Sequence, residues 1–194
     1  HPAMTVTTSN YARAENDLYQ TEPWATEALL RHFPVKGKLV WEPAAGNHLM
    51  ADVLAESGAR VVTSDITEYD RQHAFHWDFL RGAPYGVPDE VDAIITNPPY
   101  GRGNRDAVLF AKRALDLCDG MVALLLTAKF DFGKTRRFLF ADNPRFMVKI
   151  ALVDRIQWFP GESGGTEDHA WYIWGPRGSG FSHKETRWEG KGVL

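Results

Sequence analysis

The segment TNPPYG, residues 96–101, places an asparagine, two prolines and a tyrosine at the end of the apolar run VDAIIT. Proline lacks an N–H donor but keeps its carbonyl, so Asn97, Pro98 and Pro99 display acceptors with few donors. The Asn97 side-chain oxygen and the Pro98 carbonyl can accept both hydrogens of a planar amino group. Such acceptors favour a pyramidal nitrogen whose lone pair attacks without a general base, while Tyr100 offers a flat face for stacking a base. Paired prolines can also simply end a strand. The residues at the other strand ends are therefore needed to distinguish a binding motif from a strand terminator.

Two further strand ends carry residues suited to a ligand. EPAAGNH, residues 42–48, follows one short apolar strand and puts Gly46 just before a helix, where the backbone can approach a carboxylate or phosphate. Asp65 ends the next strand 19 residues after Gly46, the spacing at which an acid accepts from ribose hydroxyls. His48 replaces the second glycine of a dinucleotide fingerprint, so we expect an adenosine with a small carboxylate instead of a diphosphate. Tight packing at Gly46 and a turn cap at Asp65 are the alternatives.

Apolar runs and amphipathic segments alternate along the chain, which predicts a mainly parallel sheet with helices on both faces. We expect strands at 38–42, 59–65, 91–96, 121–128, 145–154 and 169–175, and a short one at 74–77. We expect helices at 21–34, 48–58, 104–120 and 133–144. In the first helix, Thr21 is the expected N-cap and Pro23 lies in the first turn.

The 194 residues predict one domain, with a flexible arm at 1–17, whose residues 1–3 resemble a tag remnant, and a flexible tail at 176–194. The single cysteine, Cys118, excludes an intramolecular disulfide and a cysteine-based metal cluster, and we expect it to pack in the core. The histidines show no recognised metal-ligand pattern, so no metal is expected. No apolar run is long enough to span a membrane and no signal peptide is visible, so a soluble, cytoplasmic protein is expected.

The net charge of −3 conceals a basic region. Residues 97–160 hold 11 Lys and Arg against 6 Asp and Glu, so the rest of the chain is acidic. This excess is consistent with a polyanionic partner and equally with a solvated basic helix face. Within it, the residues that could contact phosphate are Arg102, Arg105, Lys129, Lys134, Arg136 and Arg137.

The motifs EPAAG, a strand-ending Asp, HWDFL and NPPY, in that order, resemble the S-adenosylmethionine-dependent amino methyltransferases. They are most similar to the small adenine-specific DNA type of phages and prophages. DLYQTEPWATEALL, SDITEYD, RRFLFADNP and HAWYIWG extend the resemblance over about residues 17–175. It implies a Rossmann-like class I methyltransferase fold over residues 18–175. It also implies a mainly parallel seven-stranded sheet with an antiparallel last strand, and S-adenosyl-L-methionine as cofactor.

The resemblance also implies a role for each residue that matches a family motif. The cofactor would be held by Tyr19, Thr21, Pro23, Glu42, Pro43, Ala44, Gly46, Asn47, His48, Asp65, Ile66, Asp78 and Phe79. Among these, Glu42 and the 44–48 loop would hold its methionine end, Asp65 its ribose, and Asp78 and Phe79 its adenine. The target amine would be positioned by Asn97, Pro98, Pro99 and Tyr100.

The first hypothesis is methylation of the exocyclic amino group of adenine in DNA. RNA, or a glutamine amide in a protein, is the alternative acceptor, although residues 1–38 cannot form the helical N-terminal domain of the enzymes that methylate glutamine. A third hypothesis is a non-catalytic binding protein, because Asn47 and His48 depart from the usual glycine-rich loop. Base specificity would come from loops near 101–105, 128–135 and 155–168, and Trp158 and Phe159 could line the target pocket or simply pack. The oligomeric state is open.

Overall fold

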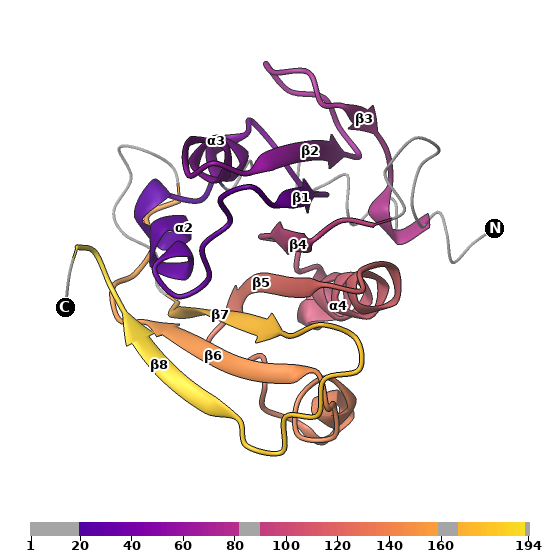
Figure 1. Ribbon diagram of the computed structural model, residues 1–194, viewed down its shortest axis with the longest axis vertical. Coiled ribbons are helices and arrows are strands. Elements are labelled where there is room, and N and C mark those ends of the chain that lie inside the picture. The colour runs from indigo at the N-terminus through magenta and orange to yellow at the C-terminus, as the bar shows by residue number, and fades with distance from the viewer. Residues whose placement is uncertain (1–19, 82–89, 159–166, 193–194) are drawn as a thin grey trace.

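The computed structural model describes residues 20–81, 90–158 and 167–192, which form an eight-stranded sheet with helices on both faces (Figure 1). The order across the sheet is β3-β2-β1-β4-β5-β7-β6-β8. The strands are β1 (Leu39–Glu42), β2 (Arg60–Asp65), β3 (Phe75–His76), β4 (Ala93–Thr96), β5 (Met121–Thr127), β6 (Phe146–Leu152), β7 (His169–Trp174) and β8 (Glu185–Glu189). Each expected strand is present, including the short one at 74–77. The predicted arm at 1–17 lies outside the described residues.

The α-helices divide between the two faces of the sheet (Figure 1). They are α2 (Pro23–Leu30), α3 (Leu49–Glu56) and α4 (Arg105–Leu117), and the 3-10 helices are η1 (Phe79–Arg81), η2 (Arg102–Asn104) and η3 (Lys134–Leu139). Alternate residues of a strand point to opposite faces, so Val40 packs with α2 and α3 while Trp41 packs with α4. Because both faces are covered, the central strands are apolar throughout, as the sequence indicated. No helix within the described ranges is long and apolar enough to cross a membrane.

The far side of the sheet corrects two expectations. β7 runs antiparallel to both β5 and β6, but the sheet has eight strands, not seven, because β8 adds in parallel to β6. The flexible tail expected from residue 176 is therefore wrong for 185–189. Glu189, the last residue of β8, accepts from Arg31 at 2.8 Å and lies 2.8 Å from Nε2 of His32, which ties the strand to the end of α2.

Two helix predictions also change in detail. The N-cap of α2 is Glu22 instead of Thr21, and its side chain makes no capping bond to the helix. Instead, the Glu22 carboxylate accepts from the backbone N–H of Gln157. The segment expected as a helix over 133–144 forms the shorter η3.

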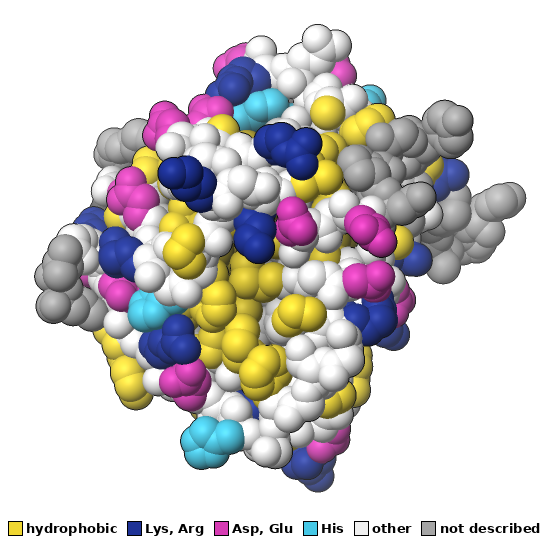
Figure 2. All heavy atoms as spheres, viewed as in Figure 1, with side chains coloured by type: hydrophobic (Ala, Val, Ile, Leu, Met, Phe, Trp, Pro, Cys, Tyr) yellow, Lys and Arg dark blue, Asp and Glu magenta, His cyan; other side chains and the backbone are white. Residues whose placement is uncertain are grey.

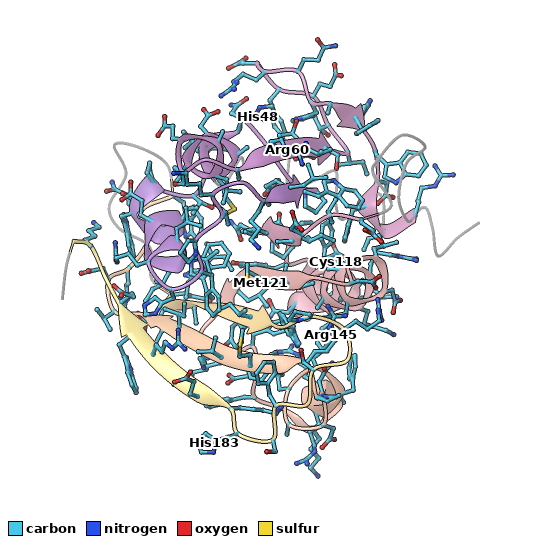
Figure 3. All side chains as sticks on the ribbon, viewed as in Figure 1. His48, Arg60, Cys118, Met121, Arg145 and His183 are labelled. Atoms are coloured by element: carbon cyan, nitrogen blue, oxygen red, sulfur yellow. The ribbon has the colours of Figure 1, made fainter. Side chains whose placement is uncertain are left out.

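Arg145 links the amino end of β6 and the carboxyl end of β7 to the end of α4. Its guanidinium donates to the carbonyls of Gly175, Leu115, Cys118 and Gly120 at 2.8 to 2.9 Å. Figure 3 shows Arg145 close to Cys118 at the end of α4. Cys118 itself is 1% exposed, so the expectation of a packed core thiol is confirmed.

Candidate functional site

The carboxyl ends of β1, β2 and β4 lie side by side, because these strands are adjacent and parallel. The strands end in Glu42, Asp65 and Thr96, and Asn97 follows directly. Ligands of doubly wound sheets bind at this edge. The structure therefore brings together the three strand ends that the sequence singled out.

Glu42 is the most enclosed acid of this edge, with 1% of its surface exposed. One carboxylate oxygen accepts from the Thr96 hydroxyl at 2.7 Å, and the other accepts from the Ala44 backbone N–H at 2.9 Å. Burial, reinforced by the charge of Asp65, raises the pKa of Glu42 to about 8 in spite of these bonds. At neutral pH the carboxyl is thus largely protonated, and a cation bound beside it would favour the ionised form.

Asp65 supports the loop that follows β1. Its Oδ2 accepts from the Gly46 backbone N–H at 2.9 Å, and its Oδ1 accepts from the Thr67 N–H at 3.2 Å. Burial raises the pKa of Asp65, and the bonds from Gly46 and Thr67 oppose that effect. A carboxylate has about four lone-pair positions. Asp65 can therefore hold the loop and still accept from two ligand hydroxyls.

His48 occupies the position at which a dinucleotide-binding fingerprint has its second glycine. It caps α3 with φ of 70°, in the left-handed region, and is 5% exposed. Its Nε2 lies 2.7 Å from Nδ1 of His73, whose Nε2 lies 2.8 Å from the carbonyl of Thr67. Because a carbonyl only accepts, His73 carries its proton on Nε2, and its Nδ1 accepts a hydrogen bond from the Nε2–H of His48. Burial lowers the pKa of His48, which favours the neutral form of this imidazole.

The NPPY segment is fixed at both ends. The Tyr100 hydroxyl lies within hydrogen-bond distance of both Oδ1 of Asn97 and the carbonyl of Leu125, at 3.0 Å each. The Asn97 amide donates to the Thr21 hydroxyl at 3.4 Å. The Tyr100 carbonyl accepts from the first backbone N–H groups of α4, those of Asp106 and Ala107, at 2.9 and 3.2 Å. Asn97 is thus held with its oxygen at the strand end, and an amide oxygen has a second lone pair for another donor.

Aromatic rings stand beside this segment. His169, the first residue of β7, pairs with Thr127 at the carboxyl end of β5. Its imidazole lies nearly parallel to the Tyr100 ring at 6.2 Å, and the Trp158 ring meets it edge-on at 5.1 Å. His169 is 5% exposed, and among the described residues no hydrogen bond of ordinary geometry reaches its Nδ1. Trp158 was considered for the target pocket from the sequence; Phe159 lies outside the described residues.

The remaining predicted cofactor residues are placed less uniformly. Asn47 and Asp78 use side-chain oxygens locally, accepting from the N–H groups of Asp70 and Leu80 at 3.1 and 3.0 Å. Phe79 is fully buried, between the rings of Trp41 and Phe110. Pro43 is buried, Ala44 and Ile66 are half-buried against the core, and Pro23 is exposed. Tyr19 lies outside the described residues.

The six predicted phosphate contacts fall into two groups. Arg102, Arg105, Lys129 and Lys134 are exposed. Arg137 pairs with Asp142 at 3.0 Å, and Arg136 donates to the carbonyls of Phe130 and Gly103 at 3.0 and 3.4 Å. Figure 2 shows a face on which basic and acidic side chains are interspersed around a central apolar hollow, so a polyanion finds no continuous basic stripe there.

Sequence reasoning missed two residues of this region. His73 lies 25 positions after His48, whose imidazole it contacts. The sequence alone shows His48 only as a histidine in place of a glycine. His169 opens an aromatic strand, HAWYIW, and a polar residue at the start of a buried strand was the signal that could have found it. Within the described ranges, no cluster of three or more His, Cys, Asp or Glu side chains could hold a metal ion.

Several solved structures share this arrangement, although no protein-family model and no curated protein matches the sequence significantly. A candidate RNA methyltransferase from Pyrococcus horikoshii has a TM-score of 0.64 at 20% identity, over 81% of this chain and 87% of its own. The modification subunit of a candidate type I restriction enzyme from Vibrio vulnificus has 0.62 at 15% identity, over 91% of this chain and 47% of its own. The 16S rRNA N2 methyltransferase of T. thermophilus, solved with AdoMet and guanosine, has a TM-score of 0.56 at 20% identity, over 81% of this chain and 44% of its own.

The chain has the Rossmann-like class I methyltransferase fold. The fold expected from the motifs is thereby confirmed. At these sequence identities the similarity shows the fold alone. This chain spans about half the length of the Vibrio vulnificus and T. thermophilus proteins.

Proposed function

We propose that this protein transfers a methyl group from S-adenosyl-L-methionine to an exocyclic amino group of nucleic acid, with adenine in DNA as the first candidate. The observation that carries the proposal is Asn97, held by Tyr100 and Thr21 with its amide oxygen at the end of β4. Pro98 follows with a second carbonyl and no N–H. Among the similar structures are proteins described as methylating RNA and a restriction-modification subunit, which supports a nucleic acid acceptor.

The residues at the strand ends suit this cofactor chemically. Asp65 has lone pairs free for two ribose hydroxyls, while its bond to Gly46 holds the loop. Glu42, with a pKa of about 8, would ionise next to the ammonium group at the methionine end of the cofactor and attract it. The cofactor supplies an electrophilic methyl group on a sulfonium centre.

The target amine would be activated by position and not by a general base. Asn97 Oδ1 and the Pro98 carbonyl accept its two hydrogens, which withdraws the nitrogen lone pair from the ring. Asn97 Oδ1 and the Pro98 carbonyl would hold the amine while the cofactor supplies the methyl group and keeps its sulfur as a neutral thioether, and the surplus amine proton would pass to water. The Tyr100 phenol stays neutral because burial raises its pKa, so it acts as a hydrogen-bond donor and as a flat surface.

RNA remains the second candidate, since an exocyclic amine in RNA fits the same pair of acceptors. A glutamine amide fits them as well, but the aromatic rings of Tyr100, Trp158 and His169 favour a planar heterocycle. The non-catalytic alternative was based on His48. The bond of His48 to His73 gives that residue a structural role that is compatible with a cofactor loop.

Methyl transfer from labelled S-adenosylmethionine to DNA and to RNA, followed by digestion to nucleosides, tests the proposal. We expect methyladenine from DNA, and a loss of turnover of about 100-fold or more in Asn97→Ala with cofactor affinity unchanged by calorimetry. Methylated nucleoside from RNA alone would move the assignment to RNA. No transfer to either acceptor, or full turnover in Asn97→Ala, would refute the proposal.

A further inference from the structure

Exposed cations lie in η2, along α4 and in the segment that follows β5. Arg102, Arg105, Lys112, Lys129 and Lys134 are exposed, and none of the five makes an ion pair within the described residues. Both acids of the segment between β5 and β6 are already paired: Asp131 with Lys149 and Asp142 with Arg137, both at 3.0 Å. Free positive charge therefore accumulates here, which suits an anionic partner.

Two aromatic rings between β5 and β6 are also exposed. Phe132 is 67% exposed and Phe138 is 43% exposed. Each has a lysine ammonium near its ring: Lys149 lies 5.9 Å from the Phe132 centroid, and Lys112 lies 5.8 Å from the Phe138 centroid. Phenylalanine left in water among charges favours a partner with flat apolar faces as well as negative charge.

The segment is attached firmly to the loop that follows NPPY. Arg136 donates from η3 to the Phe130 carbonyl at 3.0 Å and across to the Gly103 carbonyl at 3.4 Å. Its guanidinium also lies 4.6 Å from the centroid of the Phe130 ring, which is fully buried. Gly103 lies three residues after Tyr100, so a ligand on this segment is held at a fixed place relative to the proposed target site.

We propose that Phe132 and Phe138 stack unpaired bases that flank the target nucleotide, and that the five free cations contact the phosphates between them. We call these seven residues the basic-aromatic surface. The inference rests on the proposed function and narrows its substrate to single-stranded or locally unpaired nucleic acid. Stacking accepts any base, because every base has a flat face, whereas an acidic peptide would engage the cations and leave the rings without partners.

Binding of a short labelled single-stranded oligonucleotide, compared with the same sequence as a duplex, tests this inference by fluorescence anisotropy. We expect the wild type to prefer the single strand. Phe132→Ala and Phe138→Ala should each weaken single-strand binding by about 5- to 150-fold, with a much smaller effect on the duplex. Phe132→Trp should restore it, whereas Phe132→Leu should not, because leucine keeps apolar area without a ring face.

Trp188→Ala is the matched control, since Trp188 is an aromatic residue of β8 that is 61% exposed and is not part of this surface. Equal losses in Trp188→Ala, restoration by leucine, or unchanged binding in both phenylalanine variants would overturn the inference. Competition by polyglutamate that is as strong as competition by unlabelled oligonucleotide would do the same. Failure of the proposed function would look different: wild type would transfer no methyl group, while the binding measurements could still succeed.

Discussion

The polar groups at the ends of β1 and β2 and those of the basic-aromatic surface are arranged in opposite ways. In the first region, Glu42, Asp65 and the His48–His73 pair are buried. The two carboxylates accept hydrogen bonds from the loop after β1, and the two imidazoles bond to each other. In the second, five cations are exposed and make no ion pair with the part of the chain that the structure describes, and two phenylalanines are exposed to solvent. The first region fixes its polar groups by hydrogen bonds within the chain, whereas the second presents its charges and rings to solvent.

This difference separates two kinds of role. Buried bonds hold a loop within a few tenths of an ångström, as a small ligand with fixed hydroxyl positions requires. Exposed charges and rings impose little geometry but add electrostatic and stacking energy along a flexible chain. Substitutions in the first region should therefore alter cofactor binding and folding together, whereas substitutions in the second should alter nucleic acid binding alone.

The largest expected effect is in Asp65→Ala. The change removes the acceptor of the Gly46 and Thr67 N–H groups and the proposed acceptor of the ribose hydroxyls. Hydrogen bonds to a charged group contribute about 1.5 to 3 kcal/mol each, so cofactor affinity should fall by about 100-fold or more in calorimetry. Asp92→Ala is the control, because its carboxylate accepts from the Leu39 N–H at the amino end of β1. Similar affinity losses in both variants would remove Asp65 from the proposed site.

Glu42 predicts a pH dependence of folding. Its pKa is about 8 in the folded protein, compared with an ordinary value near 4.5. Between pH 4.5 and pH 8, therefore, the folded state holds a proton that the unfolded state has released. The free energy of unfolding should fall as pH rises from about 4.5 to about 8, by at most about 1.4 kcal/mol per pH unit from this group. Glu42→Gln should abolish this component.

The measurement is urea unfolding of both proteins at a series of pH values. His48 has a lowered pKa and contributes with the opposite sign at the acid end of the range, so the difference between wild type and Glu42→Gln isolates the carboxyl. A difference that does not change with pH would show that Glu42 is ionised throughout and that the region is more polar than its burial indicates.

Much of the fold and of the candidate site could be predicted because the decisive signals are local. Apolar runs of strand length, each followed by Glu42, Asp65 or Asn97, predict both the sheet and the edge where these residues meet. β8 was missed because three of its five residues are exposed and its stability comes from pairing with β6 and from the bond of Glu189 to Arg31. No local pattern encodes such a contact.

The same distinction explains why the sequence did not reveal the partners of several side chains. Thr21 has the residue type of a helix cap, but its hydroxyl accepts from Asn97, 76 positions away. His48 was interpreted against a glycine pattern, and only the fold reveals the imidazole of His73 beside it. Arg136 and Arg137 were grouped with the free cations because composition cannot show that one bonds backbone carbonyls and the other bonds Asp142.

The smallest predicted effect tests that last distinction. Lys134 is exposed without an ion pair, and Arg137 is exposed but bound to Asp142. Each phosphate contact on a single strand contributes about 0.7 to the slope of the logarithm of affinity against the logarithm of salt concentration. Lys134→Gln should reduce that slope by about 0.7, whereas Arg137→Gln should leave it nearly unchanged, because a guanidinium already held by a carboxylate displaces few counterions. Equal changes in both variants would mean that Arg137 leaves Asp142 for the phosphate, so that the cations of this segment act as one group.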